Sequence, residues 1–441
     1  MKKIFLIVLL IIFYFLFFNS NTKIKNFDDK NLHFHLINKL SKFINFDFKL
    51  LNTKEIFSNN KKISYKQFSN DKLRYRFYLS QTKNNVFLIS KDGAIFFFSK
   101  KKLFDKDIFE LTRIETNLKT LIGKEYIAEY RSIIKGITIF NDEIFVSYLS
   151  NTNSCFSNAV AHAKLNFNKI IFSSLIKLNE CKKIFNFSVG GNITKYKKNK
   201  LILTTADFDI PENLESYEKN DKIFLNEPST DPQDNSSYFG KILSIDFATK
   251  KINIISKGHR NPQGLFYDSY NDLIFSTDHG PKGGDEINID VNPTNKPIKN
   301  FGWPKSSYGV RYTEDNNFRD ISCKQKHLFK AAPLCKSHKK YGYVEPVKYF
   351  TPSIGITQII KLNDFNSNDH HELIVASMGY NREEDDMTLH SIKLNNSFQI
   401  VSHDKFYIGD RIRDVIDLKN GYILMALESS PSPSLGLVKL N

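Results

Sequence analysis

The 441-residue chain lacks the motifs of several common chemistries. It contains no GxGxxG loop, no Walker loop, no GxSxG elbow and no HExxH helix. These motifs support nucleotide binding, serine hydrolysis and zinc-dependent hydrolysis through fixed residue spacings. Their absence argues against these three classes of activity.

The chain also lacks a concentrated basic region, although its net charge is +16. Proteins that bind nucleic acid usually gather Lys and Arg on one helix or in one cluster. Here the lysines are scattered along the sequence. We interpret the charge as a lysine-rich, solvated surface and predict no nucleic-acid partner.

Cysteine is scarce, and the four residues, Cys155, Cys181, Cys323 and Cys335, show no CxxC or Cys-His spacing typical of a zinc site. Disulfides in an oxidising compartment are therefore favoured over zinc binding. Four cysteines allow three pairings. We predict Cys155–Cys181 and Cys323–Cys335, because each pair would close one local loop.

The N-terminus carries an export pattern. Two lysines precede an apolar run from Ile4 to Phe18, as in the first two regions of a signal peptide. The run is shorter than the roughly 20 residues of a membrane-spanning helix, and neither a small-x-small cleavage site nor a lipobox cysteine follows it. We predict that residues 1–21 are a signal peptide or an N-terminal membrane anchor, and that the protein is periplasmic or secreted. Residues 22–60 would form a tether or an irregular first strand.

The chain has only four methionines and one tryptophan, but it has 39 phenylalanines and 20 tyrosines. The abundance of these two aromatic residues favours strands. A polar turn followed by a short apolar run recurs six times, with the runs beginning at Ile95, Ile144, Leu201, Leu273, Leu373 and Tyr422. Repeats of about 40–50 residues that contain several strands are typical of a β-propeller. A β-sandwich is the alternative, but it rarely needs ~380 residues. We predict an all-β fold, a six-bladed β-propeller over residues 61–441.

Two polar turns flank one of these strands. Four short motifs occur in close succession: Arg260-Asn261-Pro262-Gln263-Gly264, His279-Gly280-Pro281, Gly284-Asp285-Glu286-Ile287-Asn288 and Asn300-Phe301-Gly302-Trp303-Pro304. Considered alone, the second turn offers oxygen ligands to a hard cation, although an ordinary tight turn has the same composition. In these motifs the sequence resembles the glucose/sorbosone dehydrogenase family, the soluble pyrroloquinoline quinone (PQQ) aldose sugar dehydrogenases. The resemblance implies a six-bladed propeller that binds PQQ and calcium at one end of its central channel.

The resemblance also implies roles for individual residues. Gly280 and Pro281 would offer carbonyl oxygens to calcium, and Asp285 would help to hold the metal. Three residues of the first turn, Arg260, Asn261 and Gln263, would contact the quinone. Guanidinium and amide groups suit the carboxylates of PQQ.

Near the C-terminus, Arg411-Ile412-Arg413-Asp414 resembles the strand with which the family binds the PQQ carboxylates. Residues two apart on a strand share a face, so both guanidinium groups would point into one space. Like charges side by side are unfavourable unless an anion lies between them. Arg411 and Arg413 are therefore predicted to bind the cofactor, although a solvated sheet face is the simpler alternative.

Two positions depart from the family pattern. Ser188 stands where the family has its general base, a histidine, and Asp207 follows at the spacing of the histidine's partner. Serine has no proton affinity near neutral pH, so Asp207 is the remaining catalytic candidate, with His259 or His279 as substitute bases. Gly379 stands where the family has a lysine that contacts PQQ.

We therefore carry three hypotheses from the sequence. The first is an exported PQQ- and calcium-dependent sugar dehydrogenase that oxidises a sugar C1 hydroxyl to the lactone and passes electrons to an acceptor. The alternative is a non-catalytic propeller that binds a ligand on a degenerate site and lacks the base. A calcium-dependent hydrolase such as a lactonase is the third, but it needs more acidic or amide ligands than the three offered by Asp207, Asn261 and Asp285.

Overall fold

We analysed a computed structural model of the protein. It describes residues 46–59, 61–73, 76–124, 126, 133–182, 188–208, 217–219, 222–224, 231–281, 283–309, 334–335, 338–362, 370–379, 386–428 and 432–440. The predicted signal or anchor, residues 1–21, and Cys323 lie outside these ranges. Within them, no helix is long and apolar enough to cross a membrane.

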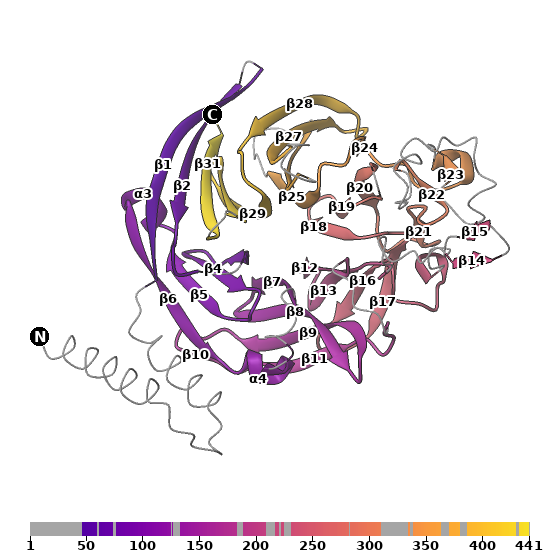
Figure 1. Ribbon diagram of the computed structural model, residues 1–441, viewed down its shortest axis with the longest axis horizontal. Helices are drawn as coiled ribbons and strands as arrows, with labels where there is room; N and C mark the ends of the chain where they lie inside the picture. Colours follow the sequence, from indigo (N-terminus) through magenta and orange to yellow (C-terminus); the bar gives the residue numbers. More distant parts are fainter. Residues whose placement is uncertain are drawn as a thin grey trace, which may run out of the picture. The chain divides into compact units, whose positions relative to one another are not determined.

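The described chain is built from β-strands, which confirms the predicted all-β class (Figure 1). Most of the described strands fall into six antiparallel groups of four, of which the first and the last belong to one ten-stranded sheet. The first three groups are β3 (Phe77–Gln81), β4 (Asn85–Ser90), β5 (Ile95–Ser99) and β6 (Ile108–Thr116); β7 (Ile134–Phe140), β8 (Glu143–Thr152), β9 (Cys155–Lys164) and β11 (Ser173–Lys177); and β12 (Gly190–Tyr196), β13 (Lys200–Thr205), β16 (Lys241–Asp246) and β17 (Ile252–Lys257).

The last three groups are β18 (Pro262–Asp268), β19 (Leu273–Asp278), β20 (Asp285–Val291) and β24 (Lys348–Phe350); β25 (Ile356–Leu362), β26 (His370–Ser377), β27 (Thr388–Asn395) and β28 (Ile400–Tyr407); and β29 (Ile412–Lys419), β30 (Tyr422–Leu427), β31 (Ser434–Leu440) and β2 (Lys61–Ser69). The smaller elements are β10 (Lys169–Ile170), β14 (Tyr217–Lys219), β15 (Lys222–Phe224), β21 (Lys299–Asn300), β22 (Ser306–Ser307), β23 (Leu334–Cys335), α3 (Lys102–Asp105), α4 (Leu118–Ile122), η1 (Asp231–Gln233) and η4 (Lys339–Tyr341).

The groups follow one another around a common centre. The first strand of each group contacts the first strand of the next, in the cyclic order β3, β7, β12, β18, β25, β29 and back to β3. The ends of the chain complete the cycle, because β2 pairs with β31 and β1 (Phe46–Ser58) pairs with both β2 and β6. The compact unit thus begins at Phe46, ahead of the boundary expected at residue 61.

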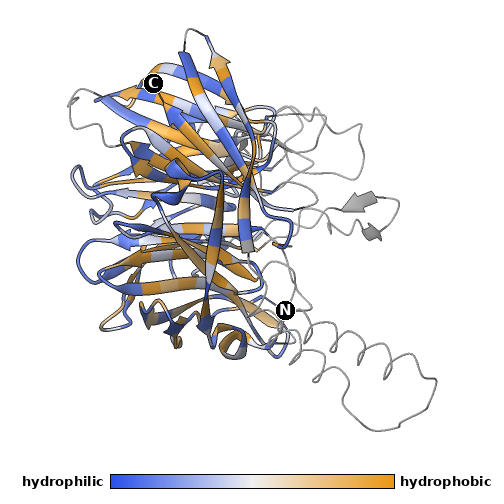
Figure 2. Cartoon of the chain, turned by 90° about the vertical axis from the view of Figure 1, so that its left-hand side faces the viewer, coloured by the Kyte–Doolittle hydropathy of each residue, from blue (hydrophilic) through white to orange (hydrophobic). Residues whose placement is uncertain are grey.

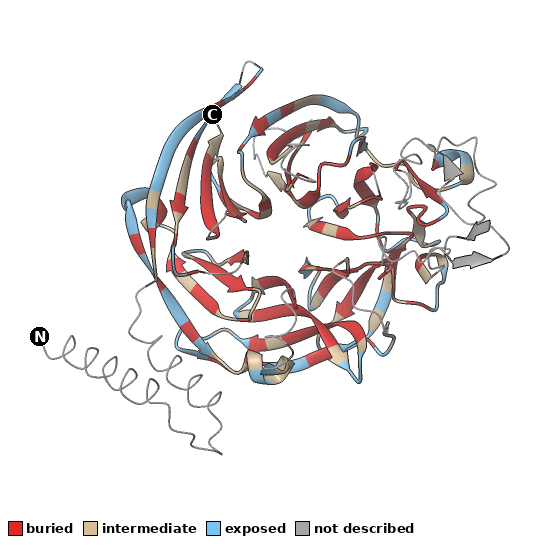
Figure 3. Ribbon diagram, viewed as in Figure 1, coloured by how far each residue is buried: buried red, intermediate tan, exposed pale blue. Residues whose placement is uncertain are grey.

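The recurring apolar runs have a physical cause in this arrangement. A hydrophobic cluster lies between each pair of neighbouring sheets, so the second strand of a group is buried on both faces (Figure 3). On β4, for example, Val86 and Leu88 face one cluster, whereas Phe87 and Ile89 face the next. Because side chains alternate across a strand, such a strand needs an unbroken apolar run. Hydrophilic residues gather in the turns and outer strands instead (Figure 2).

A disulfide closes the end of the second group. Cys155 and Cys181 are bonded, with Cα atoms 5.4 Å apart. This confirms one of the two predicted pairs. The Cys323–Cys335 pair stays a prediction, because Cys323 lies outside the described residues.

Candidate functional site

The predicted site residues cluster where the first strands of the groups begin. Gly190 pairs with Thr205, so Ser188 and Asp207 lie just beyond the same end of the β12–β13 hairpin. The Asp207 amide donates to the carbonyl of Arg260, 2.9 Å away, which connects this end to the residues preceding β18. The hairpin of the third group and the first polar turn therefore meet.

Asp278, at the end of β19, organises the first turn. Its buried carboxylate accepts hydrogen bonds from the backbone amides of Arg260 (3.1 Å) and Asn261 (2.7 Å). The ring of His259 contacts the same carboxylate at 3.2 Å. Asp278 did not emerge from the sequence, where it only precedes His279, but it fixes the backbone that carries the predicted quinone contacts.

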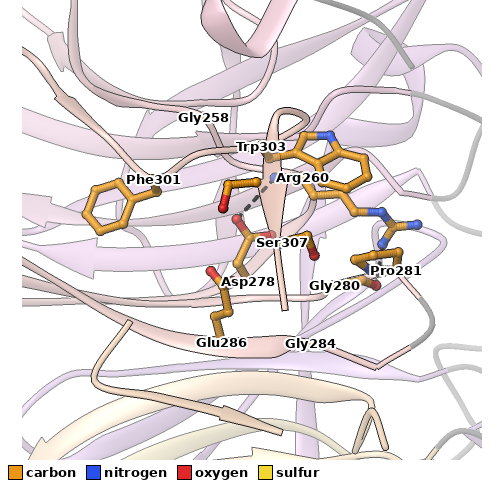
Figure 4. Close-up of a pocket in the computed structure, with 11 residues that line it drawn as sticks. Gly258, Arg260, Asp278, Gly280, Pro281, Gly284, Glu286, Phe301, Trp303 and Ser307 are labelled. Carbon is orange, nitrogen blue, oxygen red and sulfur yellow. Dashed lines mark hydrogen bonds between the residues drawn. The ribbon is translucent and has the colours of Figure 1, made fainter. Parts of the chain in front are cut away.

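The Arg260 side chain points at the second turn (Figure 4). Its Nη1 donates to the carbonyl oxygens of His279 (2.8 Å) and Gly280 (2.6 Å). The guanidinium carbon lies 5.6 Å from the centre of the Trp303 ring, at a cation–π distance. The Arg260 side chain is thus held against the second turn by two carbonyl oxygens and by the Trp303 ring.

Asn261 and Gln263 lie together. Asn261 immediately precedes β18, and Gln263 is the second residue of that strand, at an irregularity in its pairing with β19. The Gln263 side-chain amide donates to Asn261 Oδ1 at 2.7 Å, and the Gly190 amide donates to the same oxygen at 3.2 Å. From β12, the Asn192 side chain donates to the Gln263 carbonyl at 2.8 Å. Amide groups from two neighbouring strands therefore line this part of the site.

The oxygen atoms of the residues predicted to hold calcium accept hydrogen bonds from other groups of the protein. The Gly280 carbonyl accepts the Arg260 guanidinium, and the Pro281 carbonyl accepts the Ser353 hydroxyl at 3.1 Å. The Asp285 carboxylate accepts three backbone amides, those of Gly280, Ile354 and Ile356. Burial opposes ionisation of Asp285, but His279 and these amides outweigh it and lower its pKa. A cation bound to the Gly280 oxygen at 2.3–2.6 Å would be repelled by the guanidinium on the same atom.

A small hollow separates the two turns. Arg260, Asp278, Gly280 and Trp303 are among the residues that line it, with an empty volume of about 230 Å³ that includes space open to solvent. Small-molecule pockets usually measure about 300–1,000 Å³. The hollow is therefore too small to contain a tricyclic quinone by itself.

The catalytic candidate Asp207 is buried, with 1% of its surface exposed. Its Oδ2 accepts the indole N–H of Trp303 at 2.7 Å, so a tryptophan bonds to the carboxylate that a histidine would meet in the family pattern. The substitute base His259 is also engaged, because Nδ1 faces Asp278 and Nε2 lies 2.9 Å from the Ser256 hydroxyl. His279 is partly exposed, with Nδ1 3.3 Å from Asp285 Oδ1, and is the more accessible of the two histidines.

Arg411 and Arg413 share one carboxylate, that of Glu428. Arg413 Nε donates to Glu428 Oε1 at 2.6 Å, and Arg411 Nε lies 3.4 Å from Oε2. From the segment before β3, Arg76 Nη1 also contacts Oε1, at 3.3 Å. Burial alone would raise the pKa of Glu428, but Arg413, followed by Arg76 and Arg411, outweighs it and lowers the pKa to about 2. The anion expected between the two arginines is thus present in the chain itself.

Arg411 also contacts the segment where the sequence departs from the family pattern. Its Nη1 donates to the carbonyl oxygens of Met378 and Gly379, both at 3.1 Å. The residue that replaces the expected lysine therefore bonds to Arg411 through its backbone.

Comparisons with known proteins agree with these motifs. A family model described as Glucose / Sorbosone dehydrogenase matches residues 138–435. Aldose sugar dehydrogenase YliI of Escherichia coli (strain K12) is 27% identical over 180 residues, which is 41% of this chain and 42% of that protein. Quinoprotein glucose dehydrogenase B of Acinetobacter calcoaceticus is 28% identical over 139 residues, 26% of this chain and 28% of the relative. The matches span less than half the length of these curated relatives.

Solved structures show the same fold. The apo form of the soluble aldose sugar dehydrogenase of Escherichia coli superposes with a TM-score of 0.60 at 17% identity, covering 88% of this chain and 99% of the other. The holo form of the PQQ domain of a pyranose dehydrogenase from Coprinopsis cinerea gives a TM-score of 0.58 at 10% identity, covering 89% and 97%.

Proposed function

Because the chain belongs to the glucose/sorbosone dehydrogenase family, we propose that it is an exported, PQQ-binding sugar dehydrogenase-like protein. The six groups of strands would be the six blades of a propeller, with the cofactor at the end where their first strands begin. Oxidation of a sugar C1 hydroxyl to the lactone, by hydride transfer to the quinone, is the chemistry that PQQ supplies when bound. The electrons would then pass to an external acceptor.

One observation carries the proposal, namely the three arginines around Glu428. Arg76, Arg411 and Arg413 approach a single carboxylate, so positive charge exceeds negative charge at these contacts. PQQ is a tricarboxylate, and charge-assisted hydrogen bonds from guanidinium groups are among the strongest that a protein offers. The amides of Asn261 and Gln263 supply neutral contacts on the neighbouring strands, so these residues fit an anionic quinone.

Other residues of the site would hold the groups that contact the cofactor or the substrate in position. Asp278 would hold the Arg260–Asn261 backbone, and Trp303 would orient Asp207 through its indole N–H. An ionised Asp207 carboxylate could accept a proton, but a proton that moves between the substrate and this carboxylate requires a path past Trp303. The proposed ligands Gly280, Pro281 and Asp285 do not fit calcium, since their oxygen atoms already accept hydrogen bonds from the chain.

A titration of the full chain with PQQ, followed by quinone absorbance, tests the proposal directly. We expect saturable binding and dye-linked oxidation of at least one aldose. Absence of quinone binding in the presence and absence of calcium would refute it. Fractionation of cells that express the full chain tests export, with recovery in the cytosol as the contrary result.

Ser188 favours a second candidate, a quinone- or sugar-binding module without catalysis. Neither Ser188 nor the indole-bound Asp207 supplies the imidazole base of the family pattern. The Ser188→His variant separates the two candidates. If the wild type binds PQQ without turnover and the variant gains activity, only the base is missing. If both bind and neither turns over, the binding module is supported.

A hydrolase that uses a central calcium ion has less support. Among the described residues, no group of three or more His, Cys, Asp or Glu side chains could hold a metal ion. A tightly held ion in metal analysis, combined with no affinity for quinone, would reverse this order.

A further inference from the structure

Two adjoining turns of the third group lie at the end of the molecule opposite the candidate site. β12 begins beside the site at Gly190 and ends at Tyr196, where the chain turns back to Lys200 of β13. Six residue steps of about 3.3 Å place this turn roughly 20 Å from the site. The turn between β16 and β17 lies beside it, because the amide of Phe247 donates to the carbonyl of Asn199 at 3.1 Å.

These two turns carry much more positive than negative charge. Residues 195–200 and 246–251 together contain six lysines and one acidic residue, Asp246. The Asp246 carboxylate accepts hydrogen bonds from the amides of Ala248 (3.1 Å) and Thr249 (2.9 Å). The negative charge of this carboxylate is therefore used to hold the backbone of its own turn.

The lysines of these turns differ in their contacts. Lys197 forms an ion pair with Asp272 of the fourth group, with 3.2 Å between the two side chains. Three other lysines are exposed and form no ion pair with the described residues: Lys198, Lys250 and Lys251. Their ammonium groups are thus available to a partner outside the molecule.

An exposed aromatic ring adjoins the lysines. Asp272, the partner of Lys197, belongs to the same turn between β18 and β19 as Tyr270. The amide of Tyr270 donates to Asp268 at 3.0 Å, whereas 89% of the surface of Tyr270 is exposed. A tyrosine has an apolar body and a polar hydroxyl, which suit the boundary between lipid and water.

We propose that this end of the molecule docks on the surface of an anionic phospholipid bilayer. The docking surface, called here the basic end, consists of Lys198, Lys250, Lys251 and Tyr270. A lysine near an anionic membrane surface raises the affinity about fivefold. The compact unit begins at Phe46. Residues 22–45 would span up to about 80 Å when extended, which is enough for an anchor at residues 1–21 and the basic end to meet the same membrane.

The position of the basic end favours a bilayer over an acidic protein that accepts electrons. In the proposed function, an electron acceptor has to approach the quinone, which would bind at the other end of the strand cycle. A bilayer below the basic end leaves that site open to soluble sugars. The inference uses the proposed function only for this choice between partners.

Partition of the full chain between buffer and vesicles tests the inference. One kind of vesicle contains phosphatidylcholine alone, and the other contains roughly one-third phosphatidylglycerol, which supplies the negative surface potential. Because residues 1–45 meet both kinds of vesicle, the ratio of the two partition coefficients isolates the contribution of charge. We expect the anionic vesicles to be preferred at low salt, and the preference to disappear at about 0.5 M salt.

A triple variant identifies the surface that is responsible. Lys198→Gln, Lys250→Gln and Lys251→Gln together should lower the ratio about 100-fold, since each lysine contributes about fivefold. The matched control removes the same charge from exposed positions elsewhere on the molecule: Lys49→Gln, Lys124→Gln and Lys405→Gln. The control should lower the ratio by no more than about threefold, because charges more than a Debye length from the membrane are screened.

Two results of the vesicle measurements would overturn the inference, namely an unchanged ratio in the triple variant of the basic end and an equal fall in both triple variants. Retention of the chain on polyglutamate, with no preference between the vesicles, would assign the basic end to an acidic protein and would also overturn it. None of these measurements uses PQQ, so their outcome is independent of the quinone titration that tests the proposed function.

Discussion

Replacing Glu428 with glutamine tests whether the arginine cluster depends on this carboxylate for stability. The change keeps the size of the side chain and removes only its charge. The pKa of Glu428 falls from an ordinary 4.5 to about 2, and each pKa unit corresponds to about 1.4 kcal/mol. The ionised carboxylate therefore contributes about 3 kcal/mol to the free energy of unfolding at pH 7. This agrees with the ~3–5 kcal/mol lost when one partner of a buried ion pair is removed.

The pH dependence of this loss gives a second, independent check. A carboxylate with a depressed folded-state pKa stabilises the protein above its unfolded pKa, and loses this effect as the pH falls through the folded pKa. The difference between wild type and Glu428→Gln should thus shrink at pH 3 to less than half of its value at pH 7. Urea unfolding at pH 7 and pH 3 measures both values.

The surface residue Glu110 supplies the matched control for this measurement. Glu110→Gln should change stability by no more than about 0.5 kcal/mol at either pH. Our reasoning is refuted if Glu428→Gln unfolds at the same urea concentration as wild type at pH 7. It is also refuted if the loss is equally large at pH 3.

Three further predictions concern the rest of the site and the fold. Asp278→Asn replaces a charged acceptor of two amides, so we expect it to cost about 1.5–3 kcal/mol and to weaken PQQ binding; unchanged affinity in a quinone titration would contradict the positioning role. Arg260→Met frees the Gly280 carbonyl from a guanidinium, so calcium should raise the melting temperature of this variant more than that of wild type, and an equal or smaller shift would count against the competition. Serine in place of both Cys155 and Cys181, which are 26 residues apart, should lower the free energy of unfolding by about 3 kcal/mol, and urea midpoints equal to wild type would exclude a stabilising crosslink.

The all-β class could be predicted because the burial of each second strand leaves a direct mark on the sequence. A strand covered on both faces needs an apolar run, and its hairpin needs polar turn residues with positive φ, such as Asn141 and Asp142. Five of the six runs recognised in the sequence begin in the second strand of a group. The run at Ile95 lies in β5, the third strand, whereas the second strand is β4, which follows Asn84.

The pairing of β1 could not be predicted in the same way. The sequence predicts a tether or an irregular first strand here, because polar residues interrupt the segment and it carries no continuous apolar run. In the structure, Leu51 and Phe57 of this strand are exposed. What makes it a strand is pairing with β2 and with β6, which begins at Ile108. The β1–β2 pair is a local hairpin, with Ser58 opposite Lys61. The β1–β6 pair instead joins residues 46–49 to residues 108–111, and it has no local signal.

The site shows the same division between local and long-range information. The short spacing of Arg260, Asn261 and Gln263 indicates a polar turn, and the structure places these residues together. Their partners Asp278 and Trp303 lie 17 or more residues away. Asp278 has no signal in the sequence, and Trp303 belongs to a recognised motif whose contacts are seen only in the folded chain. Local spacing thus predicts which polar side chains lie together at the site. The pairing of strands decides how many of them are already hydrogen-bonded to other residues of the protein.

The arginines illustrate why this distinction matters for function. Two guanidinium groups on one strand face predict an anion, but the prediction does not say whether the anion belongs to the chain or to a ligand. Glu428 supplies one such carboxylate from the chain itself, since Arg411 and Arg413 both contact it. Arg76, from the segment before β3, adds a third guanidinium to the same carboxylate, and one carboxylate does not compensate for all three. The charge that remains is the physical reason to expect a multiply charged ligand at this end of the molecule, whether or not the protein retains a base for catalysis.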